Sequence, residues 1–361
     1  MQKNNLKSQR IETLDWLRGL MALSIMFYHI TPLIFSGFNY SSPLGRLGIY
    51  GVSIFFILSG LCMAIVYNSY IKDIKTSLNF FIRRIFRIWP LLWMATILMI
   101  LLDFDTIKYS WQLIFLNCTT LFGFIKPNAY IVEGAWSIGN EMVFYALTPA
   151  IIYLFNRKKS LGNFVLFITI LIGLFFSFYI LNPNIGLGRQ MDTYVNPFNN
   201  LFLYVMGIAM YYNLKDVSIK TKTNIILLFS AALLFCFLPF NGDRILIVTG
   251  FGRILFVFLA FIIVFCFYKM KPKLPIILEK SLTGLGLISY GIYLYHPIIY
   301  KHPLPIVGRY VHNIFGMPTN NPIFLFFLVS ALTIIISKIS YEFFELKFIK
   351  IGKHLTSNSR T

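Results

Sequence analysis

This sequence contains few charged residues. Only 12% of its 361 residues are charged, whereas 57% are hydrophobic and the mean hydropathy is +0.72. A soluble domain carries about 25% charged residues, because its surface has to be solvated. The shortage argues against a soluble globular protein and indicates a polytopic membrane protein. At about 20 residues per span, a chain of this length holds roughly ten membrane helices.

Cysteine is scarce as well. The chain has four cysteines, Cys62, Cys118, Cys236 and Cys266. They form no C-x-x-C pair, and three of the four lie inside apolar runs. This pattern indicates buried thiols rather than a disulfide framework or a zinc site. Internal repeats and low-complexity tracts are also absent. We therefore expect one membrane domain over residues 1–346 and a short polar cytoplasmic tail over residues 347–361.

Acidic residues are few, 13 against 32 Lys and Arg, and the formal net charge is +19. Such an excess is found in nucleic-acid-binding proteins, but in a membrane protein the topology explains it better, and no nucleic-acid partner is expected. If the N-terminus is cytoplasmic, 24 of the 32 basic residues fall on inner segments and inner helix ends, and the other 8 fall on outer ones. This distribution follows the positive-inside rule and predicts that both termini are cytoplasmic.

Ten apolar runs have a length that suits a membrane span. They lie near 14–35, 47–70, 85–102, 136–156, 161–181, 196–213, 223–241, 246–269, 283–301 and 322–345. The run 111–125 is too short to span and is predicted to be an interfacial or re-entrant piece. The predicted fold class is thus an all-α membrane bundle of about ten transmembrane helices.

Ionisable residues inside these spans are costly in a bilayer and are candidates for function. They are Arg18, His29, Glu141, Arg253, His296, Lys338, Glu342 and Glu345. Arg18 and His29 are eleven residues apart, which is three helical turns plus about 20°, so one helix face carries both. Along the helix axis they are separated by about 16 Å.

Glu141, His29 and His296 are each expected a short distance below the outer end of a span, and therefore at a similar depth. Two histidines and a carboxylate at one level fit a general base whose tautomer is held by the carboxylate. They also fit a proton relay in a transporter, or structural hydrogen bonding within the bundle. The spacing does not support a metal site.

Three arginines mark the inner entry to the third predicted span, in "FIRRIFRIWP". Arg83 and Arg87 are four residues apart and share a helix face, with Arg84 beside them. Guanidinium groups bind phosphate through two hydrogen bonds, although a cluster of this kind also serves as an ordinary positive-inside signal. Since Arg18 enters from the same side, a phosphorylated cytoplasmic donor and an acceptor on the far side are consistent with the pattern.

Five stretches, in this order along the chain, resemble the acyltransferase family 3 membrane proteins. They are "LDWLRGLMALSIMFYH", "GVSIFFILSGLCM", "RRIFRIWPLLW", "WSIGNEMVFY" and "ISYGIYLYHP", and together they extend over residues 14–297. Members of that family move acetyl or other acyl groups from acyl-coenzyme A to sugar hydroxyls and related acceptors. The resemblance is to the surface-polysaccharide O-acetyltransferase type, without an appended soluble hydrolase-like domain.

The resemblance implies roles for particular residues. His29 would be the catalytic histidine and Arg18 its paired signature residue. Glu141 and His296 would belong to the reaction chamber, and Arg83, Arg84 and Arg87 would belong to the cytoplasmic coenzyme A side. Together with Arg18, these arginines are expected to bind the phosphates of coenzyme A. No bound cofactor is implied: acyl-coenzyme A, with acetyl-CoA as the first choice, is a co-substrate. A saccharide or lipid-linked saccharide would be the acceptor, and the bacterial cytoplasmic membrane would be the location.

The resulting hypothesis is a membrane O-acyltransferase in which His29 acts as general base or as acyl carrier. The alternative is a proton-coupled transporter that uses His29, Glu141 and His296 as a proton relay, and a non-catalytic scaffold is a third interpretation. Residues 103–135 are interpreted either as a lid over the acceptor or as a variable connector. The acceptor sugar, the acyl chain and the oligomeric state have no signal in the sequence.

Overall fold

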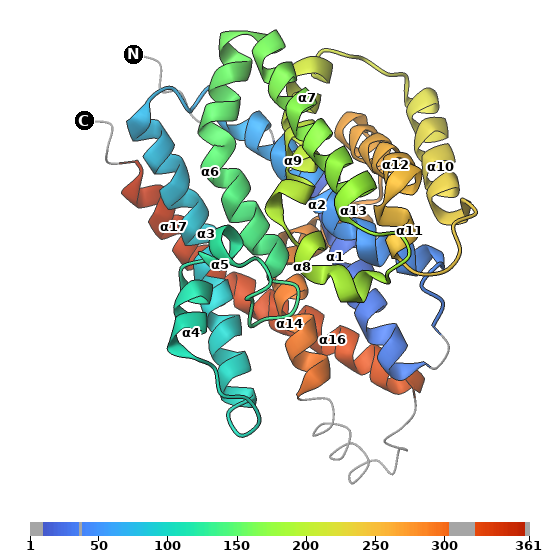
Figure 1. Cartoon of the computed structure of the whole chain (residues 1–361). Coiled ribbons are helices and arrows are strands. Elements are labelled where there is room, and N and C mark those ends of the chain that lie inside the picture. Colours follow the sequence, from blue (N-terminus) through green and yellow to red (C-terminus); the bar gives the residue numbers. More distant parts are fainter. Residues whose placement is uncertain (1–9, 36–37, 303–321, 358–361) are drawn as a thin grey trace.

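A computed structural model describes residues 10–35, 38–302 and 322–357, and the regular elements within these ranges are all helical. Figure 1 shows α1 and α2 in the middle of the bundle, between α3 with α17 on one side and α10 with α12 on the other. The helices are α1 (Glu12–Ile34), α2 (Pro43–Tyr67), α3 (Ile74–Leu102), α4 (Trp111–Cys118), α5 (Phe122–Ile125), α6 (Trp136–Arg157), α7 (Lys159–Phe175), α8 (Met191–Tyr194), α9 (Pro197–Leu214), α10 (Thr221–Phe237), α11 (Ile245–Val248), α12 (Gly250–Lys269), α13 (Ile276–Leu287), α14 (Ser289–Lys301), α16 (Pro322–Ser340) and α17 (Leu346–Leu355). Two π-helical turns, η1 (Phe176–Ile180) and η3 (Tyr341–Glu345), and one 3₁₀ turn, η2 (Leu187–Gln190), complete the described elements.

Each of the ten predicted apolar runs coincides with a helix or a helix pair. Within the described residues, six helices are long and apolar enough to cross a membrane, and a seventh is added if one bent pair counts as a single span. The all-helical membrane fold is therefore confirmed, whereas the count of about ten spans and the side of the termini stay predictions. The short run 111–125 forms the two short helices α4 and α5.

Glycines set the closest helix contacts. A Cβ atom on Gly207 of α9 would lie 2.0 Å from the carbonyl oxygen of Ile57, and one on Gly60 of α2 would lie 1.9 Å from that of Tyr204. The backbones of α2 and α9 thus approach so closely that no side chain fits between them. Small residues have this function between membrane helices, where packing drives association in place of the hydrophobic effect.

The packing of α1 against α2 shows which residues of the two helices lie at the same depth in the bundle. A Cβ on Gly48 would meet the Tyr28 ring, and one on Gly51 would meet Ile25. Residue numbers rise on one helix as they fall on the other, so the pair is antiparallel. Ser59, eight residues beyond Gly51, therefore lies at the level of residues 17 and 18 of α1.

The predicted span 283–301 is broken. It forms part of α13 and all of α14, which meet at Ile288 with a bend of 65°. α13 packs against the first half of α1, where a Cβ on Gly286 would lie 2.2 Å from the Asp15 carbonyl oxygen. After the bend, α14 packs against the second half of α1 and carries His296 towards it.

The segment 103–135 folds back into the bundle. The side chain of Asn117 is fully buried; it donates to the Ala129 carbonyl at 2.8 Å and accepts from the Ile131 amide at 2.9 Å. This clamp leads the chain inward, so that α6 begins at Trp136 with a buried first turn instead of at an exposed end. The clamp anchors this segment inside the bundle, whether it serves as a lid over the acceptor or as a variable connector.

The last helix continues further than predicted. α16, η3 and α17 follow one another without a break, and α17 packs against α3, as Figure 1 shows. Residues 347–355 of the predicted polar tail are therefore helical, and Gly352 lets this helix approach Phe86 of α3 closely. Residues 358–361 of the predicted tail lie outside the described residues.

The contact between α2 and α9 leads to a stability prediction. Gly207→Ala places a methyl group against the Ile57 carbonyl and should destabilise the fold by about 1–3 kcal/mol, as overpacking of a tight interface does. Gly284→Ala is the control, because a Cβ there has nothing within 4 Å. Thermal unfolding of the two detergent-purified variants checks this. Equal melting temperatures would contradict the proposed close contact.

Candidate active site: a histidine pair beyond a basic cavity

Two histidines from distant parts of the chain form a hydrogen-bonded pair. His29 of α1 and His296 of α14 have their rings nearly parallel, at 8°, with Nδ1 of His29 2.9 Å from Nε2 of His296. His296 is only 1% exposed, whereas His29 is partly exposed. The structure therefore brings together two of the three predicted catalytic residues.

One backbone carbonyl determines which ring nitrogens of this pair carry a proton. Nδ1 of His296 lies 2.9 Å from the carbonyl oxygen of Ile292, which only accepts, so Nδ1 carries the proton. In neutral His296 the Nε2 atom then has a lone pair, and His29 must donate from Nδ1. Neutral His29 is thereby left with its own lone pair on Nε2. The free basic nitrogen of the pair is on the more accessible ring.

Further polar groups, outside the set of predicted site residues, lie next to this pair. Glu133 precedes α6, accepts a hydrogen bond from Tyr300 at 2.8 Å and forms an ion pair with Lys301 at 2.6 Å. Burial raises the pKa of the Glu133 carboxyl, but the hydrogen bond and charge of Lys301 outweigh burial and leave that pKa below its ordinary value. Glu133, not Glu141, is the carboxylate whose charge acts most on His29. Because Glu133 lies in a predicted loop, nothing in the sequence indicated that it acts on His29.

A cavity of about 490 Å³ opens between α1, α2, α3, α6, the α13–α14 pair and α17. Its lining is rich in charge. The basic residues are Arg10, Arg18, Arg84, Arg87 and Lys353, and the acidic ones are Asp15, Glu141 and Glu345. Such a cavity suits a ligand that carries several negative charges at one part and neutral polar groups at another.

The predicted arginine cluster divides between two environments. Arg84 donates to the Tyr67 hydroxyl at 3.0 Å, and Arg18 lies 3.4 Å from Asp15, both at the cavity wall. Arg87 is exposed at the cavity and, within the described part of the chain, has no ion pair or hydrogen bond. Arg83 is not part of the lining. Its Nε donates to Thr356 at 2.7 Å, and its guanidinium lies 4.8 Å from the centre of the Tyr70 ring.

The expected depth of Glu141 is wrong. Its carboxylate accepts hydrogen bonds from Ser59 and Tyr145 and not from an imidazole. Because Ser59 is level with residues 17 and 18 of α1, Glu141 lies with Arg18, about 16 Å from the level of His29. The reason is the inward course of residues 126–135, which starts α6 inside the bundle. The sequence alone predicts that this start lies at the outer membrane surface.

A layer of three residues separates the cavity from the histidine pair. The Tyr293 hydroxyl donates to the Gly134 carbonyl at 2.8 Å and lies 2.8 Å from the Ser137 hydroxyl. Tyr293 and Ser137 line the cavity, and the Tyr293 ring centre is 6.1 Å from that of His296. Gly134 has φ +86°, a left-handed conformation that suits glycine, and this places its carbonyl where both hydroxyls reach it. The His pair lies about one helical turn beyond this layer.

Two other buried arginines are hydrogen-bonded within the protein. Arg253, an ionisable residue of a predicted span, donates to the side-chain and backbone oxygens of Asn199 at 2.5 and 2.6 Å. Arg46 donates to three carbonyls at the end of α10, among them that of Phe235 at 3.0 Å. These two arginines have a structural role. In the described residues, no group of three His, Cys, Asp or Glu side chains is placed to hold a metal ion.

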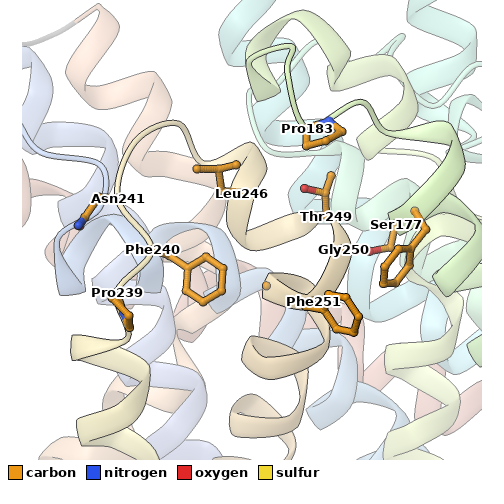
Figure 2. Close-up of a pocket in the computed structure, with 11 residues that line it drawn as sticks. Ser177, Pro183, Pro239, Phe240, Asn241, Leu246, Thr249, Gly250 and Phe251 are labelled. Atoms are coloured by element: carbon orange, nitrogen blue, oxygen red, sulfur yellow. The ribbon is translucent and has the colours of Figure 1, made fainter.

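A second hollow, of about 460 Å³, lies between the loops around Pro183 and Pro239. Figure 2 shows Phe240, Leu246 and Phe251 around it. Its lining residues include no charged side chain, and the polar ones, such as Ser177 and Thr249, are few. Its lining offers neither a base nor a cation.

Comparison with known proteins gives one family. The model of an acyltransferase domain matches residues 11–342. Among curated proteins, the chain is 24% identical to "Putative peptidoglycan O-acetyltransferase YrhL" of Bacillus subtilis, over 93% of this chain and 54% of that protein. It is also 24% identical to "Peptidoglycan O-acetyltransferase OatA" of Listeria monocytogenes, over 95% of this chain and 56% of that protein. No solved structure matches.

The chain thus spans a little over half the length of these relatives. The matches are to acyltransferases, and they lend no support to the proton-coupled transporter considered from the sequence. The apolar helices and the bacterial relatives agree on a multi-pass membrane protein. Since the family model covers most of the sequence, the chain belongs to the family of membrane proteins that carry this acyltransferase domain.

Proposed function

We propose that this protein is a membrane O-acyltransferase. It would move an acyl group, with acetyl as the expected one, from cytoplasmic acyl-coenzyme A to a hydroxyl of an envelope saccharide. The observation that carries the proposal is the free Nε2 lone pair of His29, held one helical turn beyond a cavity rich in cations. The names of the relatives, which refer to peptidoglycan, support a saccharide acceptor.

The donor site is the basic cavity. Coenzyme A carries its phosphates at one end and its thioester at the other, joined by a flexible pantetheine arm. Arg87, which has no partner among the described residues, and Arg18 and Arg84 beside it would hold the phosphates. The cavity mouth would then face the cytoplasm, in line with the predicted topology. Glu141, held by Ser59 and Tyr145, would balance the charge of these arginines.

The thioester end would reach the histidine pair past Tyr293. In the structure the Tyr293 hydroxyl is bound to Gly134 and Ser137, so the layer is closed, and the ring would turn aside as the arm enters. The acceptor would approach from the opposite side, where Glu133 and Lys301 lie near His29. The donor and the acceptor would thus meet at His29 from two sides of the membrane.

The chemical step is a general-base transfer. Nε2 of His29 takes the proton of the acceptor hydroxyl while that oxygen forms a bond to the thioester carbonyl carbon. The carbon–sulfur bond then breaks, and the departing sulfur takes the proton back from the imidazolium. His296 accepts a hydrogen bond from Nδ1 of His29 throughout, which stabilises the positive charge on that ring. The products are the acylated saccharide and free coenzyme A.

The first test is the loss of His29. His29→Ala should lower the transfer of label from acetyl-CoA into envelope saccharide by about 10²–10⁴-fold, the usual contribution of a general base. His354→Ala is the control, because His354 is exposed on α17 and is not among the residues that line the cavity. Membranes with equal amounts of each variant provide the measurement. Equal incorporation with His29→Ala would remove this histidine from the mechanism.

His296 is predicted to position His29 and not to touch the substrates. His296→Phe should lower kcat by about tenfold or more and leave the KM for acetyl-CoA unchanged, since His296 is outside the cavity lining. His296→Gln should restore part of the rate, because its carbonyl oxygen accepts from Nδ1 of His29. Steady-state kinetics decides between the roles. A rise in KM with constant kcat would instead indicate a binding residue.

Two neighbouring arginines are predicted to differ. Arg87→Gln should raise the KM for acetyl-CoA by about 10–100-fold, the effect of losing one charged hydrogen bond to a phosphate. Arg83→Gln should change it little, because Arg83 is directed at Thr356 and Tyr70. The KM of both variants is measured at low and high salt, since salt screens the wild-type attraction. Equal effects of the two substitutions would argue against this cavity as the donor site.

A further inference from the structure

One carboxyl group of the cavity has no role in the function proposed above. Glu345 is only 5% exposed, and its Oε1 atom is buried without a hydrogen-bond partner. It lines the same cavity as Arg87, whose charge acts on it, yet in the described structure no ion pair joins them. A buried carboxyl oxygen without a partner is costly, and more so within a membrane.

The local backbone is built to direct Glu345 inward. Residues Tyr341–Glu345 form a π-helical turn between α16 and α17. The extra residue of such a turn rotates the helix that follows it, and π turns are frequent at functional sites. Glu342 and Phe343 are exposed, whereas Tyr341 and Glu345 line the cavity. The irregular turn thus places a carboxyl on the cavity wall.

The chemistry of the cavity restricts what Glu345 would bind. The oxygens of an ionised carboxylate only accept hydrogen bonds, so the partner of the Glu345 carboxylate is a donor N–H or O–H. Phosphate groups offer acceptors and negative charge, and a carboxylate repels them. The group that satisfies Glu345 is therefore a neutral polar part of the ligand, next to the anionic part that Arg87 would hold.

The position of Glu345 along the cavity indicates which part of the ligand it would contact. Ile349 and Lys353 line the cavity at four and eight residues beyond it, about 6 and 12 Å along α17 towards the basic mouth. In the other direction, Glu345 acts electrostatically on Tyr290, one helical turn before Tyr293. Glu345 thus lies between the cationic mouth and the layer that precedes the histidine pair. In acyl-coenzyme A, the pantetheine arm lies between the phosphates and the thioester.

We propose that Glu345 is a specificity-determining residue that accepts a hydrogen bond from an amide N–H or the hydroxyl of the pantetheine arm. The inference rests on the proposed function, because it assumes that acyl-coenzyme A occupies the cavity. It adds that the protein recognises the arm itself and not only the phosphates. Acyl donors that lack this arm, such as acetyl phosphate, are then poor substrates.

The test compares three inhibitors of acetyl transfer. Coenzyme A carries both the arm and the nucleotide, 4′-phosphopantetheine carries only the arm, and adenosine 3′,5′-bisphosphate carries only the nucleotide. Glu345→Met should weaken inhibition by the first two about tenfold, the effect of one lost hydrogen bond to a charged group, and leave inhibition by the third unchanged. Glu345→Gln should restore most of the inhibition by coenzyme A and 4′-phosphopantetheine, because the amide oxygen still accepts a hydrogen bond.

Two further variants keep the test decisive. Glu342→Met is the matched control, because Glu342 is exposed on the same π turn, and it should leave inhibition by all three molecules unchanged. Glu345→Ala shows the same pattern as Glu345→Met if the lost acceptor is the cause, and it is measured alongside in case the methionine variant does not fold. Melting temperatures of the purified variants identify any that is unfolded.

The remaining outcomes overturn the inference. Weaker inhibition by adenosine 3′,5′-bisphosphate as well would place Glu345 against the nucleotide and not the arm. Unchanged inhibition by coenzyme A in both Glu345→Met and Glu345→Ala would remove Glu345 from the donor site while leaving the proposed function intact. If coenzyme A does not inhibit the wild-type protein and acetyl-CoA supports no transfer, the donor assignment fails, and the role of Glu345 fails with it.

Discussion

A polar group inside a bilayer has no water to bind, so the protein itself must satisfy it. This constraint accounts for most of the buried charge in the bundle. Arg46 caps the end of α10, and Arg253 is held by Asn199. Three groups without a protein partner in the described residues lie at or just beyond one cavity: the exposed Arg87, the buried Oε1 of Glu345, and Nε2 of His29.

The arrangement separates two tasks along α1. Arg18 is at the level of Glu141 and the cavity arginines, whereas His29 is about 16 Å further along the same helix face. A flexible donor that is anionic at one end and reactive at the other fits this separation. The break at Ile288 serves the same geometry, since it lets α13 pack beside Asp15 and still brings His296 to His29. A straight helix would not follow α1 at both levels.

Much of the fold could be predicted from the sequence, because a membrane helix is indicated by a local property, a run of about 20 consecutive apolar residues. The ten runs all became helices, and the shared face of Arg18 and His29 follows from helix geometry alone. The depth of Glu141 could not be predicted in this way. It depends on where α6 begins, and the Asn117 clamp on residues 129–131 decides that through contacts within a long loop.

By itself, the sequence determined that the chain is a helical membrane protein and which ionisable residues enter its spans, because both depend on composition and helical period. Only the tertiary structure decided how those residues are paired. It joined His29 to His296 and fixed their protons through the Ile292 carbonyl, directed Arg83 away from Arg87, and left Glu345 facing the cavity. The physical reason is that a hydrogen bond acts over about 3 Å, whereas these partners are up to 273 residues apart in the chain.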